Sequence, residues 1–221
     1  MSELPVYIPP KTDELLISWI DRLADANCLT QREFMSSFVF NGNGRKTNYL
    51  VLDCQIDISG FIPWIKQQIS VEDVILKHTE YPAVAPFISA QRQSQMLLAA
   101  FGAPFTKSLN HKSITIRTCQ ACQETDPYIR RSHCLPGVKA CWRHGTSLTG
   151  EEISDADIKY ARYVHDWLEA MPDFDVTTLR KSLSLVNMDE YCDFRKRRTV
   201  GQGISLKTGQ GQSARSAGLI I

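Results

Sequence analysis

Residues 117–148 read RTCQACQETDPYIRRSHCLPGVKACWRHGTSL, and they carry the strongest structural signal in the chain. Two pairs of soft metal ligands, Cys119 with Cys122 and Cys141 with His144, are separated by 18 residues. A two-residue spacer lets both side chains of a pair reach one ion from a single turn, so the two pairs can close a tetrahedral zinc site. Three thiolates and one imidazole fill that shell and leave no position for a catalytic water. We therefore expect one structural Zn²⁺.

Two alternatives to this ligand set remain open. The four residues could be unrelated buried thiols and a surface histidine. His133 and Cys134 lie between the pairs and could replace a ligand, although sequence neighbours share one ion with poorer geometry. The remaining cysteines are isolated, and we expect small core fillers or inert thiols at Cys28, Cys54 and Cys192.

Composition places the chain among ordinary globular proteins. Its 221 residues are 43% hydrophobic and 22% charged, and they include no apolar run that approaches a membrane span. The amino terminus lacks the apolar core of a secretion signal. Several cysteines in a metal-like arrangement favour a reducing compartment, so we expect a cytoplasmic, nucleoid-associated protein. The net charge is only +1, but residues 195–221 contain six basic residues and no acidic ones.

The first part of the chain has the periodicity of paired helices. Residues 13–26 place one helical face at Leu16, Trp19, Ile20 and Leu23. Asp13 and Glu14 precede this face, where the helix dipole favours negative charge.

A second helix is predicted to start at a capping box formed by Thr30 and Glu33. Its inward residues are expected to be Phe34, Phe38 and Val39. A helix, a short turn and a capped helix are typical of a helix-turn-helix, although a plain helical hairpin in a core gives the same pattern. If the pair binds DNA, the second helix presents Gln31, Arg32, Ser36 and Ser37 to the bases.

The rest of the chain is also predicted to be mainly α-helical. Helices are expected over 58–69, 71–78, 89–101, 155–171 and 176–187, with a short strand over 113–117. Ser70 and Ser154 are predicted helix caps, and the Tyr81-Pro82 and Ala85-Pro86 steps are predicted breaks. We expect a helical region over 1–112, a zinc-ribbon-like insertion over 113–150, carboxy-terminal helices over 151–198 and a flexible basic tail over 199–221.

The loop at residues 41–48, NGNGRKTN, is polar and rich in turn residues. A phosphate-binding loop requires Gly immediately before its Lys, and Arg45 occupies that position before Lys46. Two interpretations remain, a solvated turn and a basic loop in which Arg45 and Lys46 contact a nucleic-acid backbone.

The zinc-binding stretch resembles the TniQ/TnsD family, the target-selection proteins of Tn7-like transposons. The shared elements are Cys119, Cys122, Tyr128, Arg130, Arg131, His133, Leu135, Pro136, Gly137, Val138, Cys141, His144, Gly145 and Leu148. The chain departs from the family pattern at Gln120, where Pro is usual, and at Cys134, where Gln is frequent. The resemblance covers about residues 5–150 and is most specific in the zinc segment.

This resemblance implies a non-catalytic adaptor rather than an enzyme. Members of the family link a target-recognition complex, either an RNA-guided CRISPR effector or a DNA-bound factor, to an AAA+ transposition ATPase. The short chain is more similar to a compact TniQ than to the longer TnsD proteins. The alternative is a stand-alone zinc-containing helix-turn-helix regulator of DNA. A zinc hydrolase is disfavoured because the four ligands fill the coordination shell.

Candidate contacts with nucleic acid or a partner lie in two further places. Tyr128, Arg130 and Arg131 between the ligand pairs offer a stacking surface and guanidinium groups suited to phosphates or carboxylates. The other interpretation is that the two arginines are solvated while His133 and Tyr128 pack beside the metal. The second place is the basic run Arg195, Lys196, Arg197 and Arg198, which can neutralise phosphates, although a solvated terminus would look the same.

Overall fold

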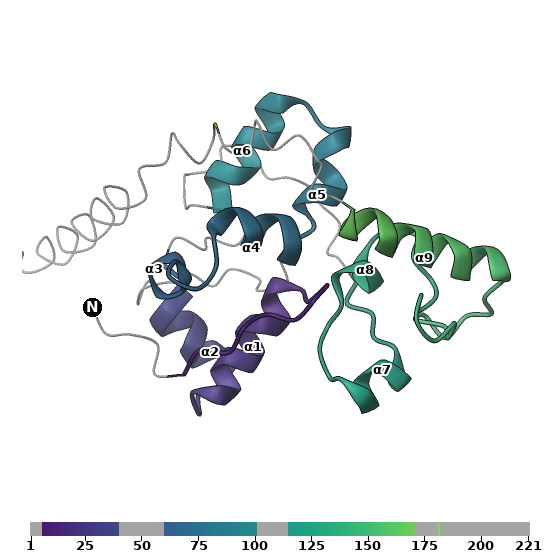
Figure 1. The fold of residues 1–221 in the computed structure, drawn as a ribbon, viewed down its shortest axis with the longest axis horizontal. Coiled ribbons are helices and arrows are strands. Elements are labelled where there is room, and N and C mark those ends of the chain that lie inside the picture. Colours follow the sequence, from purple (N-terminus) through teal and green to yellow (C-terminus); the bar gives the residue numbers. More distant parts are fainter. Residues whose placement is uncertain (1–5, 40–59, 101–114, 171–180, 182–221) are drawn as a thin grey trace, which may run out of the picture. The chain divides into compact units, whose positions relative to one another are not determined.

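The computed structural model of this chain describes residues 6–39, 60–100, 115–170 and 181, all within one compact unit, Met1–Val186 (Figure 1). The elements in these ranges are α1 (Leu16–Ala26), α2 (Gln31–Phe34), η1 (Met35–Val39), α3 (Ile62–Ile65), α4 (Val71–His78), α5 (Tyr81–Val84), η2 (Ala85–Phe87), α6 (Ala90–Ala100), α7 (Gln120–Thr125), α8 (Arg131–Cys134) and α9 (Asp155–Glu169). No strand occurs in those ranges, which contain two isolated β-bridges. The mainly α-helical fold class is confirmed.

Several predictions fall on other residues. The loop at 41–48, the helix at 176–187, the tail at 199–221, and the contact residues Arg45, Lys46, Arg195, Lys196, Arg197 and Arg198 lie outside the described ranges. The strand predicted over 113–117 is wrong for 115–117, which belong to no strand or β-bridge in the part of the chain that is described. In the same part, no helix has both the length and the apolar content needed to cross a bilayer.

Helix α1 is the most deeply buried element of the amino-terminal part. All four residues of its predicted apolar face are buried. The Trp19 indole nitrogen donates to the carbonyl of Ile8 at 2.8 Å, and its ring meets Phe61 edge-on at 5.5 Å between centroids. Asn27 holds the amino-terminal arm, residues 6–15, at its outer end, because its side chain bonds both the N–H and the carbonyl of Val6. The arm is thereby fastened along α1.

The prediction that Asp13 and Glu14 stabilise the first turn of α1 is wrong. The helix begins at Leu16, with no acidic residue in its first turn. Asp13 has a positive φ of 57°, a conformation that Asp tolerates better than most residues, and its side chain is buried. Glu14 is buried as well and accepts a hydrogen bond from Arg22 at 2.8 Å. Both carboxylates therefore have tertiary partners.

The helix pair predicted after α1 is present in modified form. Thr30 and Glu33 make the expected capping box at α2, which continues into the π-helical turn η1. Phe34 and Val39 are buried as predicted, whereas Phe38 is half-buried against Trp64. A Cβ atom at residue 60 would lie 2.1 Å from the Val39 carbonyl oxygen, so only glycine fits where the chain returns to η1.

Serine caps and prolines define the other helix starts. Ser70 caps α4 and Ser154 caps α9, as predicted. The helix predicted over 58–69 is shorter, with only Ile62–Ile65 as α3. The predicted breaks at Pro82 and Pro86 instead start the short helices α5 and η2, because a proline in the first turn loses no intrahelical hydrogen bond.

The segment before α1 pairs with the segment before α8. Glu14 and Arg130 form an antiparallel bridge, and the N–H of Leu15 donates to the carbonyl of Ile129 at 2.9 Å. The N–H of Arg131 donates to the carbonyl of Asp13 at 2.7 Å. These bonds join residues more than a hundred positions apart and fix the amino-terminal arm to the segment that carries the ligand pairs.

Side chains strengthen this junction in its interior. The Asp13 carboxylate accepts hydrogen bonds from the N–H of Ser132 at 3.1 Å and from the Ser132 hydroxyl, and it lies 3.6 Å from Nε of Arg131. The Arg131 guanidinium also donates to the carbonyl of Leu76 at 2.5 Å. Burial raises the pKa of Asp13, while Arg131 and Ser132 oppose that change. The ionised form of Asp13 is therefore stabilised by Arg131 and Ser132 against the cost of burial.

Helix α9 covers the other side of the ligand segment. Its buried stripe Ala161, Val164 and Leu168 packs on Leu135 and Val138, with the predicted residues Ile158 and Trp167 partly buried beside them. The second ligand pair thus lies next to an apolar contact that continues to α9.

Replacing the buried carboxylate at residue 13 tests the junction. In Asp13→Asn the positive φ and one acceptor oxygen are retained, but Arg131 loses its buried counter-charge. We expect the free energy of unfolding to fall by about 3 to 5 kcal/mol. Glu151→Gln is the control, because the Lys139–Glu151 pair is about half exposed or more, lies outside the junction and contributes about 1 kcal/mol or less. Urea unfolding measures both; equal losses in the two variants would contradict the proposed junction.

Two buried histidines give a second test, in the pH dependence of stability. Burial lowers the pKa of His78 and of His133 to about 4. The unfolded chain therefore binds more protons between pH 6.5 and 4, and stability should fall as the pH is lowered through that window, by up to about 3 kcal/mol for each histidine. In His78→Gln, whose amide can still donate to the carbonyl of Glu14, the slope should be about half as steep. An unchanged slope would show that His78 titrates normally.

Candidate metal centre

The first ligand pair is placed by the start of helix α7. Cys119 immediately precedes α7 and Cys122 lies in its first turn. Because residues three apart on a helix share one face, both Sγ atoms point the same way. The N–H of Gln123 donates to the carbonyl of Cys119 at 3.0 Å and closes this turn.

The second pair lies in a tight hairpin-like turn. Ala140 and Ser147 form an antiparallel bridge, and the N–H of Cys141 donates to the carbonyl of Thr146 at 2.8 Å. Gly145 has a φ of 63° and donates to the carbonyl of Cys141 at 2.8 Å. The left-handed glycine reverses the chain directly after His144, which lets the turn close.

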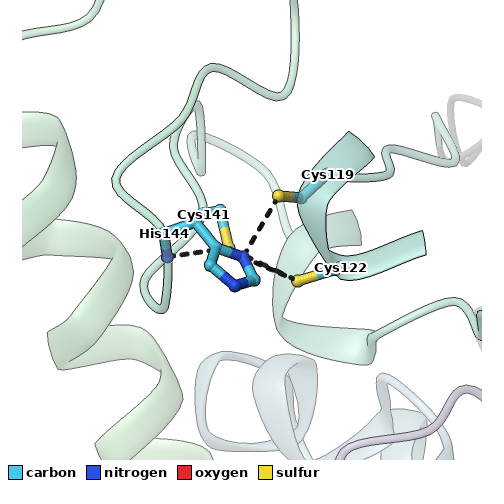
Figure 2. A group of neighbouring side chains, drawn as sticks. All are labelled: Cys119, Cys122, Cys141 and His144. Carbon is cyan, nitrogen blue, oxygen red and sulfur yellow. Dashed lines mark hydrogen bonds between the residues drawn. The ribbon is translucent and has the colours of Figure 1, made fainter. Parts of the chain in front are cut away.

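The structure brings the four predicted ligand residues together (Figure 2). Nδ1 of His144 lies 3.2 Å from Sγ of Cys122, 3.4 Å from Sγ of Cys119 and 3.7 Å from Sγ of Cys141. The sulfurs of Cys122 and Cys141 are 3.7 Å apart, and all four ligand atoms lie within 4.8 Å of one another. A tetrahedral ion with metal–sulfur bonds of about 2.3 Å requires sulfurs about 3.7 Å apart. These residues could therefore hold a metal ion.

The two competing ligand candidates lie outside this cluster. Cys134 packs in an apolar group with Leu15 and Ile17, and burial raises the pKa of its thiol to about 11. His133 is buried, and burial followed by the charge of Arg130 lowers its pKa to about 4. Neither residue belongs to the group whose ligand atoms converge. Cys28 is exposed, so of the two expectations for it the core filler is wrong and the inert thiol stays a prediction, and Cys54 and Cys192 lie outside the described ranges.

The three thiols have different electrostatic surroundings. Burial raises the pKa of Cys119, but hydrogen bonds led by that from Thr146 outweigh it, and the pKa is lowered to about 6. Burial, followed by the neighbouring Cys141, raises the pKa of Cys122 to about 12. Such a group of thiols cannot ionise together without a compensating charge, and a divalent cation supplies that charge.

Arg130 and Arg131 are not on the surface. Each is at most 3% exposed. The Arg130 guanidinium lies over the Tyr128 ring at 4.2 Å and approaches Asp126 at 3.9 Å, and the Tyr128 hydroxyl donates to the carbonyl of Thr12 at 3.0 Å. A nucleic-acid contact through either arginine would require this packing to open, so their surroundings favour a role inside the junction with the arm.

Arg32 is the remaining predicted contact residue that the structure describes, and it is exposed on α2 together with Gln31, while Ser36 and Ser37 are exposed on η1. Sequence reasoning missed Asp13 and Ser132, which anchor the ligand segment. A pairing across 119 residues leaves no periodic signal in one sequence. It also missed Thr146, whose hydroxyl lies 3.1 Å from Sγ of Cys119.

Two buried cysteines of the same region allow a matched test of the ligand set. Cys141→Ser removes a converging sulfur, and Cys134→Ser changes a buried thiol outside the cluster. We expect Cys141→Ser to lose most of the bound metal and Cys134→Ser to keep the wild-type amount, because oxygen is a poorer ligand than thiolate for a soft site. Elemental analysis of dialysed protein measures the metal per chain. Metal loss from Cys134→Ser but not from Cys141→Ser would assign the ligands differently.

Comparison with known proteins places this centre in a family. No curated protein matches the chain, and no solved structure matches it. A family model described as TniQ matches residues 5–148, which include the arm, helix α1, both ligand pairs and the segment between them. The chain belongs to the TniQ family.

Proposed function

We propose that this protein is a non-catalytic adaptor in transposon target selection. Membership of the TniQ family gives the chain a transposition-associated role. The proposed adaptor links a target-recognition complex, an RNA-guided CRISPR effector or a DNA-bound factor, to an AAA+ transposition ATPase. The observation that carries this proposal is the family match across residues 5–148.

The metal centre in this proposal is a single structural Zn²⁺. Three sulfurs and one imidazole nitrogen are a ligand set that Zn²⁺ accepts in tetrahedral geometry, and the distances between the ligand atoms fit it. Four protein ligands leave no open position for a substrate or an activated water, which supports a structural role. Three free thiols at a soft site are best maintained in a reducing compartment, and we propose a cytoplasmic, nucleoid-associated location.

The packing of the ligand segment supports recognition rather than chemistry. Its buried charges bind the arm, through Asp13 and Arg131, and its apolar residues bind α9. The outward-facing groups among the described residues include the polar start of α2 and the exposed face of α9, where Tyr160 and Tyr163 are 46% and 66% exposed. A rigid interior with polar and aromatic residues outside is suited to binding other macromolecules.

The α1–α2 pair favours one alternative, a stand-alone DNA-binding regulator. Gln31 and Arg32 are exposed at the start of a helical stretch that follows a short turn, as base contacts in a helix-turn-helix require. The four-residue α2 followed by a π-turn departs from a regular recognition helix. This departure makes the regulator the second choice.

A paired binding measurement separates the two functions. The full chain, purified with its metal, is presented to the AAA+ ATPase of its own element and, separately, to duplex DNA. The adaptor predicts capture of the ATPase on size-exclusion chromatography, and DNA binding that is weak, independent of sequence and sensitive to salt.

Two charge reversals provide the control. Arg32→Glu and Arg162→Glu alter the net charge equally, but only Arg32 lies at the start of α2; Arg162 is exposed on α9. Tight, sequence-specific duplex binding that is lost in Arg32→Glu and kept in Arg162→Glu, without capture of the ATPase, would establish the regulator and overturn the adaptor.

A further inference from the structure

We propose that Thr146 is a positioning residue of the metal centre, whose hydroxyl donates a hydrogen bond to Sγ of Cys119 and holds that sulfur as a metal-bound thiolate. The two atoms are 3.1 Å apart. The proposal rests on the metal centre described under the proposed function. It concerns a residue outside the ligand set. Thr146 lies in the second of the two ligand-bearing turns, which we call the first knuckle (residues 119–122) and the second knuckle (residues 141–146), and the sulfur that it contacts lies in the first.

The direction of this hydrogen bond follows from the chemistry of a bound thiolate. A cysteine that ligates a metal has lost its proton, so its sulfur can only accept. The Thr146 hydroxyl keeps its proton and therefore donates. Three thiolates around a divalent ion also leave one negative charge in excess, and a donor aimed at sulfur disperses part of that charge.

The backbone of the second knuckle places Thr146 for this contact. Its carbonyl accepts the N–H of Cys141 at 2.8 Å, which fixes its main chain beside a ligand. Gly145, at a φ of 63°, turns the chain so that the next side chain faces the first knuckle. The turn that presents Cys141 and His144 also sets the position of the Thr146 side chain. The contact between Thr146 and Cys119 therefore links the two knuckles without the ion.

A second donor comes from the same turn. The N–H of His144 points at Sγ of Cys141 at 3.4 Å. Two of the three sulfurs therefore accept a hydrogen bond from the second knuckle, one from backbone and one from the Thr146 side chain. Only the side-chain donor can be removed by substitution without altering a ligand.

The size of the effect is limited by exposure. Thr146 as a residue is exposed, so a water molecule can partly replace its hydroxyl. Loss of a hydrogen-bond partner of a metal ligand typically weakens metal binding by about 10- to 100-fold. We expect about tenfold here, at the lower end of that range.

The test uses the full chain with valine and serine at residue 146. Thr146→Val keeps the shape and removes the donor, Thr146→Ser restores the donor, and Thr118→Val changes an exposed threonine next to Cys119 as the control. Competition with a chromogenic chelator measures zinc affinity. The Co²⁺-loaded protein gives the sulfur-to-metal charge-transfer band, which reports on the sulfur itself.

We expect Thr146→Val to bind zinc about tenfold more weakly and to shift the charge-transfer band to longer wavelength, since an unbonded thiolate is easier to oxidise. Thr146→Ser and Thr118→Val should match the wild type in both. Wild-type affinity and an unshifted band in Thr146→Val would overturn the proposal, as would a serine variant that restores neither. A wild-type chain that binds neither Zn²⁺ nor Co²⁺ would instead overturn the metal centre itself.

Discussion

Closure of one loop by four side chains is the constraint on which the central part of this protein depends. Cys119 and Cys122 stand at one end of the loop, and Cys141 and His144 stand at the other. Between them, the described structure contains two short helices, α7 and α8, and few other regular hydrogen bonds. A segment with so little secondary structure has a large conformational entropy to lose, and an ion shared by the four side chains would offset much of that loss.

The closed loop in turn orders the amino-terminal arm. Arg131 and Ser132 reach Asp13 in the interior, and backbone pairing between Glu14 and Arg130 aligns the two segments. Taking two charges out of water is unfavourable unless each is fully partnered, and the shape of the loop places Arg131 and Ser132 as the partners of Asp13. The metal centre and the arm are therefore parts of one structural unit, although the arm contributes no ligand.

How well the sequence predicts each feature of this structure depends on how far apart in the sequence the interacting residues lie. Local signals were reliable: the capping box at Thr30, the serine cap of α9 and the apolar face of α1 all appear as predicted. The ligand pairs were found because their spacing repeats within a few residues. The buried positions of Arg130 and Arg131 were not predicted, since Asp13 is distant in sequence and a pair of arginines is usually solvated. The strand predicted over 113–117 failed at 115–117 because alternation alone does not supply a partner strand.

The division between a charge-bearing interior and an outward polar and aromatic surface fits the proposed adaptor, which would bind partners without performing chemistry. We infer that a sulfur-rich ion site shapes the region that the arm and α9 pack against. X-ray absorption spectroscopy at the zinc edge of the purified chain tests this most directly. The account predicts one zinc in a shell of three sulfurs and one nitrogen, with metal–sulfur distances of about 2.3 Å. A chain that folds natively without zinc, or a shell dominated by oxygen, would contradict it.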